Sequence, residues 1–509
     1  KVIKISESSI CNPVFKQERK LLSKITGEDL VRKDIWYLGG SNYYYDGKIK
    51  RISYRDWYKN KEHLLWAEEL RNDIEIEDYE EYQNVVRANE TYIKNIVFEA
   101  EQYIHETIAK YPSPEYIPTI SFSGGKDSSV VSRIVMDTLQ TDSIIHFFGD
   151  TTLEFPETYE YVNGGFRKEN PRVALLPTET DNDFFKLCKV FGPPSQHERW
   201  CCTIFKTSNL NKEFDNLPGK SLTFLGIRHS ESVARSKYER TREESKISSQ
   251  INAMPIIEWK DYDVWLYILY KKMTVNPCYQ YGYKRVGCWC CPNNNQRAQF
   301  LSRIYMPEQS KAWRDFLIDF ARKIGKPDAE EYVDSGAWKA RQGGNGLAAA
   351  GDVKIRFTNC TTEDHAKIYR LVRPMDDEFL NMLTPFGRVA PELGQKLLHE
   401  VLVLDIRTNV PILSVQPFEQ GGYEFAVKVR TMNVKDHDDL QHMVGYQVRK
   451  FNACRKCLKC ESLCKAGAIS ISADRYYIDP EKCVHCKMCM TAKYLRGGCM
   501  MDKYLRTKD

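Results

Sequence analysis

"ISFSGGKDSSVV", residues 120–131, is the stretch that decides the fold. An apolar run ends in two glycines, and a lysine, an aspartate and two serines precede a second apolar run. This order predicts a strand, a tight turn and a helix that begins at the turn. Glycines there let backbone N–H groups approach a phosphate, and the helix N-terminus adds partial positive charge. The alternative is a plain glycine turn in which Asp127 or Ser128 only caps the helix.

The sequence around this stretch predicts a parallel sheet. From Thr119 to about Trp265, short apolar runs alternate with segments long enough for crossover helices; the runs are "TISFS", "SIIHFFG", "RVALLP" and "SLTFLG". Such alternation is typical of a doubly wound α/β domain. The expected fold class is therefore α/β, with further small domains attached.

Changes in composition divide the 509 residues into five expected parts. Residues 1–112 are expected to be mostly helical, and the proline-rich "YPSPEYIP" closes that region. Residues 113–294 form the nucleotide-binding domain, and residues 295–345 form a helical extension that ends in "RQGGNGLAAAG". Three strand-like runs and one helical run predict a small α+β module over residues 346–450. Residues 451–509 are a separate cysteine-rich block.

Composition is that of a globular protein, with 42% hydrophobic and 28% charged residues and no apolar run long enough to span a bilayer. The charged first residues do not resemble a secretory signal, so we expect a cytoplasmic protein without a membrane partner. The net charge of +5 does not by itself indicate nucleic acid. Most of the seventeen cysteines are clustered, which in a reducing compartment indicates metal binding. We expect Cys11, Cys188 and Cys360 to be buried apolar residues.

Five segments in order carry a resemblance to a known family. "SGGKDS" looks like the PP-loop of the ATP pyrophosphatase superfamily, and within it the chain resembles the phosphoadenosine phosphosulfate (PAPS) reductase family over about residues 117–293. The other matching segments are "GDTTLEFPET", "RWCCTIFK", "GIRHSESVAR", and "PIIEWKDYDVWLYI" with "NPCYQYGYKRVGCWCCP". The resemblance implies a PP-loop fold (adenine nucleotide alpha hydrolase-like) and an enzyme that binds an adenine nucleotide.

The resemblance also implies roles for individual residues. The nucleotide phosphates would be bound by Ser123, Gly124, Gly125, Lys126, Asp127, Ser128, Arg228 and Arg235. The guanidinium fork of arginine suits phosphate and sulfate oxygens, although the residues alone would suggest that "RHSESVARSKYERTR" is a solvated basic face. Lys126 and Mg²⁺ would neutralise charge that develops on pyrophosphate, and Asp127 or Asp150 would help to hold the metal.

Two departures from the sulfonucleotide reductases decide which bond we expect to be broken. Those reductases usually lack the full Gly-Gly-Lys-Asp-Ser run, whereas members that cleave ATP between the α and β phosphates retain it, as this chain does. The thiol-dependent reductases also carry a nucleophilic cysteine in a Glu-Cys-Gly-(Leu/Ile)-His segment, which does not occur in this sequence. We therefore expect ATP to adenylate an acceptor oxygen that sulfur then replaces.

The first group of cysteines consists of an adjacent pair, Cys201 and Cys202, and a distant CxxC, Cys288 and Cys291. An iron–sulfur cluster, a tetrahedral zinc ion and unligated thiols are the three interpretations. The group looks like the [4Fe-4S] site of the adenylyl-sulfate reductases in the family. Cys290 and Cys278 complicate the assignment, because Cys278 could replace one of the ligands or either thiol could carry the transferred sulfur.

The second group of cysteines has bacterial ferredoxin spacing. In "CRKCLKCESLC" and "CVHCKMCMTAKYLRGGC" three thiolates of each run would hold one cubane and the fourth would cross to the other cluster. Two features depart from the pattern: Lys465 and Met500 replace the usual proline, and Cys499 lies unusually far from Cys489. Zinc is the alternative metal. The predicted ligand sets are Cys454, Cys457, Cys460 and Cys499 for one cluster, and Cys483, Cys486, Cys489 and Cys464 for the other.

Three functional hypotheses follow. The first is an iron–sulfur enzyme with three [4Fe-4S] clusters that uses ATP and Mg²⁺ for sulfur transfer to nucleic acid or another acceptor. Its partners would be an electron donor and a cysteine desulfurase or other sulfur donor, and its fused ferredoxin domain would supply electrons. The second is a reductase that releases sulfite from adenylyl sulfate or its 3′-phosphorylated form. The third is a nucleotide and redox sensor without catalytic activity.

Overall fold

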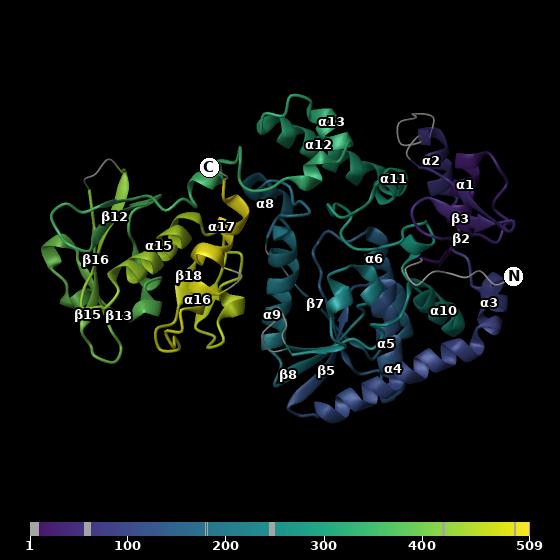
Figure 1. Ribbon diagram of the computed structural model, residues 1–509, viewed down its shortest axis with the longest axis horizontal. Helices are drawn as coiled ribbons and strands as arrows, with labels where there is room; N and C mark the ends of the chain where they lie inside the picture. Colours follow the sequence, from purple (N-terminus) through teal and green to yellow (C-terminus); the bar gives the residue numbers. More distant parts are fainter. Residues whose placement is uncertain are drawn as a thin grey trace. The chain divides into compact units, whose positions relative to one another are not determined.

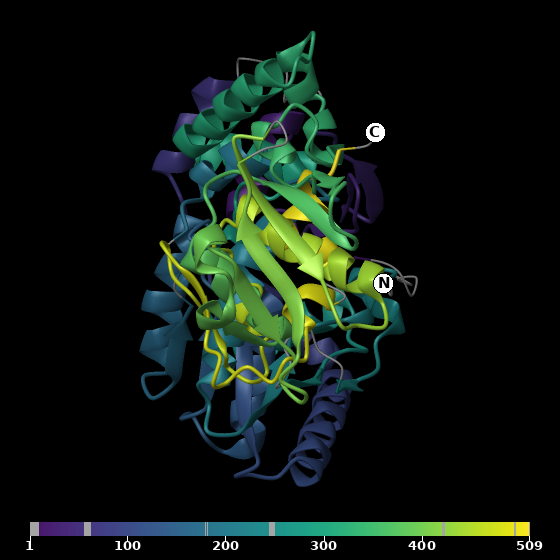
Figure 2. The same cartoon turned by 90° about the vertical axis from the view of Figure 1, so that its left-hand side faces the viewer.

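A computed structural model describes residues 10–54, 63–178, 180, 182–243, 250–419, 423–492 and 495–507 (Figures 1 and 2). Contacts between residues divide the chain into two compact units. The first unit comprises residues 1–180 and 210–316, and the second comprises residues 181–209 and 317–509. The chain passes from one unit to the other three times: after residue 180, within α9 (Ser208–Asp215) and within α12 (Pro307–Lys323).

A six-stranded sheet of order β7-β6-β5-β8-β10-β9 is the centre of the first unit (Figure 1). All neighbouring strands pair in parallel except β9, which runs antiparallel to β10. This sheet confirms the predicted parallel α/β core, since the four predicted runs form β5 to β8. The strands are β5 (Tyr116–Phe122), β6 (Ile145–Phe148), β7 (Ala174–Pro177), β8 (Lys220–Leu225), β9 (Thr241–Arg242) and β10 (Gln250–Ala253).

Apolar side chains cover both faces of this sheet, as expected for a doubly wound fold. On one face Ile120 and Phe224 join a core formed largely with the helices α4, α5 and α10. Phe122 and Phe148 lie on the same face and pack with Phe166. On the opposite face Phe147 of β6 packs with Leu210 and Phe214. Besides α9 and α12, which cross between the units, the helices of this unit are α1 (Lys16–Thr26), α2 (His63–Asn72), α3 (Gln83–Ala88), α4 (Glu90–Lys110), α5 (Lys126–Leu139), α6 (Pro156–Glu160), α7 (Arg167–Glu169), α10 (Asp261–Lys271) and α11 (Gln296–Tyr305).

The N-terminal region contains a sheet that the expectation of a mostly helical region did not include. Four antiparallel strands pair in the order β1-β2-β3-β4. They span only two to four residues each, too short to show an alternating apolar pattern in the sequence. The strands are β1 (Asn12–Pro13), β2 (Trp36–Tyr37), β3 (Asn42–Tyr45) and β4 (Lys48–Arg51).

The second unit contains a six-stranded antiparallel sheet, which faces the viewer in Figure 2, with α15 packed against it. The predicted strand runs form β14, β15 and β16, and the predicted helix forms α15; the remaining three strands lacked a clear pattern. The sheet strands are β11 (Phe357–Asn359), β12 (Ala366–Leu371), β13 (Arg388–Ala390), β14 (Val401–Leu404), β15 (Pro411–Pro417) and β16 (Phe425–Thr431).

In the described residues of the cysteine-rich block, the regular elements are a two-stranded sheet and short helices. Other elements of the second unit are α8 (Phe184–Phe191), α13 (Ala329–Asp334), α14 (Asp377–Asn381), α15 (His437–Ala453), β17 (Ile469–Ile471), β18 (Tyr476–Ile478), α16 (Met488–Thr491) and α17 (Met500–Leu505). None of the helices in the described part of the chain has the length and hydropathy needed to cross a membrane.

Candidate functional site

The glycine loop lies where the strand order reverses. The chain builds β5, β6 and β7 toward one edge of the sheet, and β8 and β10 follow on the other side of β5. The connections that leave the adjacent strands β5 and β8 therefore run toward opposite edges of the sheet. Open α/β sheets bind ligands between two such connections, at the carboxyl ends of the strands. Residues 123–125 connect β5 to α5, and residues 226–228 follow β8, so both predicted phosphate-binding segments meet at this point.

Two glycines allow this close packing. Gly124 has a φ of +67°, and a Cβ on it would lie 3.0 Å from Thr158 and from Val162. A Cβ on Gly226 would lie only 2.7 Å from the backbone carbon of Asp127. Side chains larger than hydrogen would therefore push the loop and the start of α5 out of position.

Hydroxyl groups bind the loop backbone. The Ser123 N–H donates to the Ser128 Oγ at 3.2 Å, and the Gly125 N–H donates to the Ser123 Oγ at 3.4 Å. The Ser128 hydroxyl in turn donates to the Gly125 carbonyl at 2.8 Å. Asp127 makes no capping bond to the first turn of α5, so the capping alternative is not what the structure shows for this residue.

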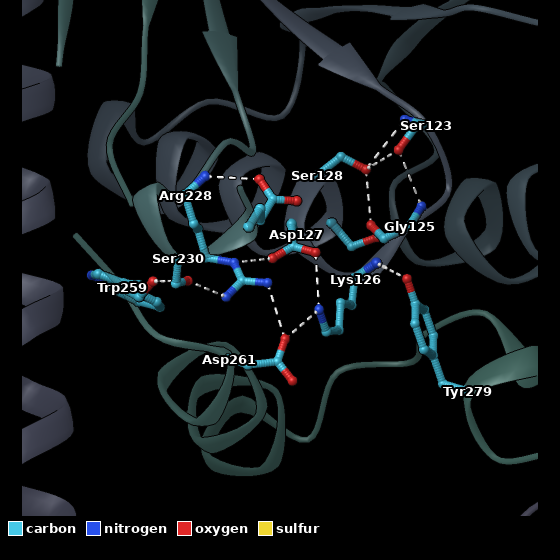
Figure 3. A network of polar contacts seen from close by, with 12 residues as sticks. Ser123, Gly125, Lys126, Asp127, Ser128, Arg228, Ser230, Trp259, Asp261 and Tyr279 are labelled. Carbon is cyan, nitrogen blue, oxygen red and sulfur yellow. Dashed lines mark hydrogen bonds and ion pairs between the residues drawn. The ribbon is translucent and has the colours of Figure 1, made fainter. Parts of the chain in front are cut away.

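Four charged side chains form a closed network beside the loop (Figure 3). The Lys126 Nζ lies 3.0 Å from the Asp127 Oδ2 and 3.0 Å from the Asp261 Oδ1. The Arg228 Nε lies 2.6 Å from the Asp127 Oδ1, and its Nη2 lies 3.0 Å from the Asp261 Oδ1. Each cation thus contacts both carboxylates, and the formal charge of the four groups sums to zero.

The cations of this network are more deeply buried than the carboxylates. Side-chain exposure is 3% for Lys126 and 5% for Arg228, but 18% for Asp127 and 15% for Asp261. Burial opposes the charged form of Lys126, but the two aspartates outweigh it and raise its pKa. Burial likewise opposes ionisation of Asp127, but Lys126 and Arg228 outweigh it and lower its pKa. The same aspartates raise the pKa of Arg228, so Lys126, Asp127 and Arg228 are all charged at neutral pH.

Sequence reasoning missed two members of the site. Asp261 begins α10, and Tyr279 accepts a hydrogen bond from the Lys126 N–H at 3.0 Å. Both residues lie in segments that carried the family resemblance, but an aspartate at a helix start usually indicates only helix stabilisation. Spacing alone could not show that they meet the loop, since Tyr279 is 153 residues away from Lys126.

Two predicted residues lie outside the four-residue network. Arg235 pairs with Glu231, whose Oε2 also accepts the backbone N–H of Arg228 at 3.0 Å. Asp150 follows β6, and its Oδ1 accepts hydrogen bonds of 2.7 Å from the Thr152 N–H and from the Tyr159 hydroxyl. Within the described residues no hydrogen bond or ion pair joins Asp150 to Lys126, so the role of Asp150 as a metal ligand stays a prediction.

Cys288 lies near the carboxyl end of β6. Its Sγ is 3.3 Å from the Thr151 Oγ1, and Cys288 forms a β-bridge with Glu154. Cys278 is fully buried in an apolar core, 3.7 Å from a Glu157 carboxylate oxygen, and burial holds its pKa well above the usual range. Cys201 and Cys202 belong to the second compact unit, so the first predicted ligand set stays a prediction.

Several C-terminal thiols lie close enough to other members of their predicted ligand set to affect one another's charge. Burial raises the pKa of Cys499, and repulsion from the negative charges of its three predicted partners raises it further. These partners are Cys454, Cys457 and Cys460. Burial likewise raises the pKa of Cys483, followed by the charges of Cys464 and Cys486. A small pocket is lined by all four thiols of the second set, Cys464, Cys483, Cys486 and Cys489.

A buried lysine, Lys450, lies beside these thiols and indicates whether they suit an anionic metal cluster. This lysine of α15 is 1% exposed, and its Nζ donates to the Cys489 carbonyl at 2.8 Å. No ion pair with a carboxylate is found for it among the described residues, although a buried ammonium group needs compensating charge. Burial lowers its pKa, but the charges of neighbouring thiolates, first that of Cys460, raise it above the ordinary value.

Thiolates bound to iron would supply that charge, so the donor set fits an iron–sulfur cluster in its chemistry. In geometry, no group of three or more His, Cys, Asp or Glu side chains within the described ranges is placed to hold a metal ion. The clusters and their ligands therefore stay predictions.

The domain around the loop matches a known family. Residues 117–294 match the phosphoadenosine phosphosulfate reductase domain family. An uncharacterized protein of Methanocaldococcus jannaschii is 33% identical over 261 residues, which cover 51% of this chain and 52% of the relative. The adenosine 5′-phosphosulfate reductase of Anoxybacillus flavithermus is 29% identical over 150 residues, which cover 28% of this chain and 60% of the relative. The chain spans only half to three-fifths of the length of these curated relatives.

Solved structures give weaker similarities. The phosphoadenylyl-sulfate (PAPS) reductase of Candida auris in a phosphate complex shows 18% identity and a TM-score of 0.30, covering 43% of this chain and 98% of that one. The FMN adenylyltransferase of Candida glabrata, in complex with FMN and an ATP analogue, shows 17% identity and a TM-score of 0.31, covering 39% and 64%.

Proposed function

We propose a function for a chain whose residues 117–294 form a domain of the phosphoadenosine phosphosulfate reductase family: ATP-dependent sulfur transfer to an oxygen of a nucleic acid or another acceptor. The observation that carries the proposal is the complete loop with Lys126, which contacts Asp127 and Asp261 beside Arg228 at the switch point of the sheet. This site offers two cations and the N-terminus of α5 to a polyphosphate.

The proposed reaction has two steps. The acceptor oxygen attacks the α-phosphorus of ATP, the bond between that phosphorus and the bridging α–β oxygen breaks, and pyrophosphate leaves with the electron pair. A sulfur nucleophile then attacks the acceptor carbon or phosphorus, and AMP leaves with the former acceptor oxygen. Lys126 and Arg228 would stabilise the charge that develops on pyrophosphate.

The network explains how Lys126 and Arg228 stay buried and charged without a bound nucleotide. In the structure Asp127 and Asp261 neutralise them, which makes burial of Lys126 and Arg228 tolerable. A bound Mg²⁺ ion would add the positive charge that a tetra-anionic nucleotide requires at a site of zero net charge. Asp127 is the loop residue proposed to hold it, and its lowered pKa keeps the carboxylate ionised.

The C-terminal cysteines are proposed to form two [4Fe-4S] clusters of a ferredoxin-like domain, and the Cys201, Cys202, Cys288 and Cys291 set a third. Such clusters supply electrons one at a time. The proposal gains support from the neighbouring thiols of each C-terminal set and from the buried charge of Lys450. An electron donor and a sulfur donor would be the protein partners.

Reduction of a sulfonucleotide is the second candidate function. Relatives named adenosine 5′-phosphosulfate reductase, from Anoxybacillus flavithermus and from Staphylococcus epidermidis, favour it. In that case the loop would hold the phosphate and sulfate end of the nucleotide, and the iron–sulfur clusters would supply two electrons that release sulfite.

One pair of assays distinguishes ATP-dependent sulfur transfer from sulfonucleotide reduction. Anaerobically reconstituted protein is incubated with ATP and Mg²⁺ or with a sulfonucleotide and a reductant, and both pyrophosphate and sulfite are measured. Sulfur transfer predicts pyrophosphate from ATP, lost in Lys126→Ala, and sulfite at the level of a protein-free control. Sulfite without pyrophosphate would reject the proposal in favour of the reductase, and full pyrophosphate release by Lys126→Ala would reject the role of Lys126.

A further inference from the structure

A tyrosine hydroxyl lies at the N-terminus of α5. The first turn of a helix leaves backbone N–H groups without helical partners, and those groups are the ones that bind phosphate. One of them, the Lys126 N–H, donates to the Oη of Tyr279 at 3.0 Å (Figure 3). Tyr279 is the last residue of η7, a single helical turn at Pro277–Tyr279.

The position of this hydroxyl is fixed by packing. Tyr279 is 3% exposed, and its ring meets that of Trp265 edge-on, with centroids 5.6 Å apart. A Cβ on Gly125 would lie 3.3 Å from the Tyr279 Oη and 3.3 Å from the Ser123 Oγ. The phenol oxygen therefore packs closely against the loop, beside Gly125 and the Ser123 hydroxyl.

The phenol also keeps a proton to donate. Burial raises the pKa of Tyr279 to about 12, which leaves the hydroxyl neutral at physiological pH. Its oxygen accepts the Lys126 N–H, and in the described part of the chain no residue is recorded as an acceptor for the phenol hydrogen. A neutral tyrosine is both donor and acceptor, so its donor capacity is left for a ligand.

We propose that Tyr279 is a phosphate-binding residue of this site and donates its phenol hydrogen to the pyrophosphate end of the nucleotide. The inference rests on the proposed function, since it assumes that the loop holds the β and γ phosphates of ATP. Tyr279 then acts twice: its oxygen holds the Lys126 N–H in place, and its hydrogen contacts the substrate.

Calorimetric titration of three proteins with pyrophosphate, ATP and AMP tests this role. Tyr279→Phe should bind pyrophosphate and ATP about ten-fold more weakly than the wild type, because a hydrogen bond to a charged group is lost. Its affinity for AMP should not change. The control is Tyr267→Phe, which removes a buried hydroxyl on α10, from a residue 1% exposed that packs against Trp259; it should bind all three ligands as the wild type does.

A second variant keeps the fold intact and changes the donor. With 3-fluorotyrosine at position 279 the phenol is more acidic and donates more strongly, so pyrophosphate should bind more tightly. Equal or tighter pyrophosphate binding by Tyr279→Phe would overturn the inference, and so would an equal loss of AMP affinity, which would show a role in folding alone. A wild-type protein that binds neither ATP nor pyrophosphate would overturn the proposed function as well.

Discussion

Gly226→Ala is the substitution that tests the loop geometry most sharply. The added Cβ would lie 2.7 Å from the backbone carbon of Asp127 and 2.8 Å from the Ser128 nitrogen. Ordinary van der Waals contact begins at 3.4 Å, so the start of α5 and β8 must separate by about 0.7 Å. Overpacking of this kind costs about 1–3 kcal/mol of folding stability. A displacement of that size at the phosphate-binding turn should weaken ATP binding about ten- to a hundred-fold.

A matched control lies at the other end of the same strand. A Cβ on Gly219, which precedes β8, would lie 2.8 Å from the Glu115 carbonyl oxygen, far along the strand from the loop. Both variants are compared by chemical denaturation and by calorimetric titration with ATP and Mg²⁺. We expect similar losses of stability but weaker ATP binding only in Gly226→Ala. Wild-type ATP affinity in Gly226→Ala, with a lowered stability, would refute the argument that the loop position governs binding.

Three further predictions concern charge. Asp261→Asn leaves the network with a net charge of +1, so in EDTA the variant should bind ATP about ten-fold more tightly than the wild type. Weaker binding would contradict the charge count. Lys450→Met removes the buried cation next to the C-terminal thiols, so the reduction potential of a reconstituted cluster, measured by EPR titration, should fall. Lys456→Met, at a lysine paired with Glu378, should change this potential less. Burial lowers the pKa of His146 to about 4. Between pH 6.5 and 4 the unfolded chain therefore binds one more proton at this residue than the folded chain, and the free energy of unfolding decreases as the pH is lowered. Denaturation curves of His146→Gln should lack this contribution to the pH dependence.

The parallel sheet could be predicted because its strands are short runs, largely apolar, between turn residues. In "TISFS" and "SLTFLG" small hydroxyl residues alternate with apolar ones, and Thr119, Ser221 and Thr223 are nevertheless buried because their hydroxyls bond to one another. The N-terminal sheet could not be predicted, since strands such as Trp36–Tyr37 are too short to establish a period. Its side chains instead suggest a mixed aromatic and charged surface.

The site was predicted in part for a similar reason. Lys126, Asp127 and Arg228 lie in motifs that resemble a family, and the structure brings them together. Asp261 and Tyr279 contribute single contacts from distant segments, and only the folded chain shows that they reach the loop. The clash at Gly226 is likewise a property of two segments in contact, 99 positions apart by residue number for Asp127 and Gly226.

The measurement that tests the central claim most directly is ³¹P NMR of the product mixture from anaerobic protein, ATP, Mg²⁺ and an acceptor. Cleavage between the α and β phosphates predicts that AMP and pyrophosphate appear together, in equal amounts, and that neither forms with Lys126→Ala. ADP and orthophosphate as the products, or unchanged ATP alongside sulfite release from a sulfonucleotide, would contradict the proposed function.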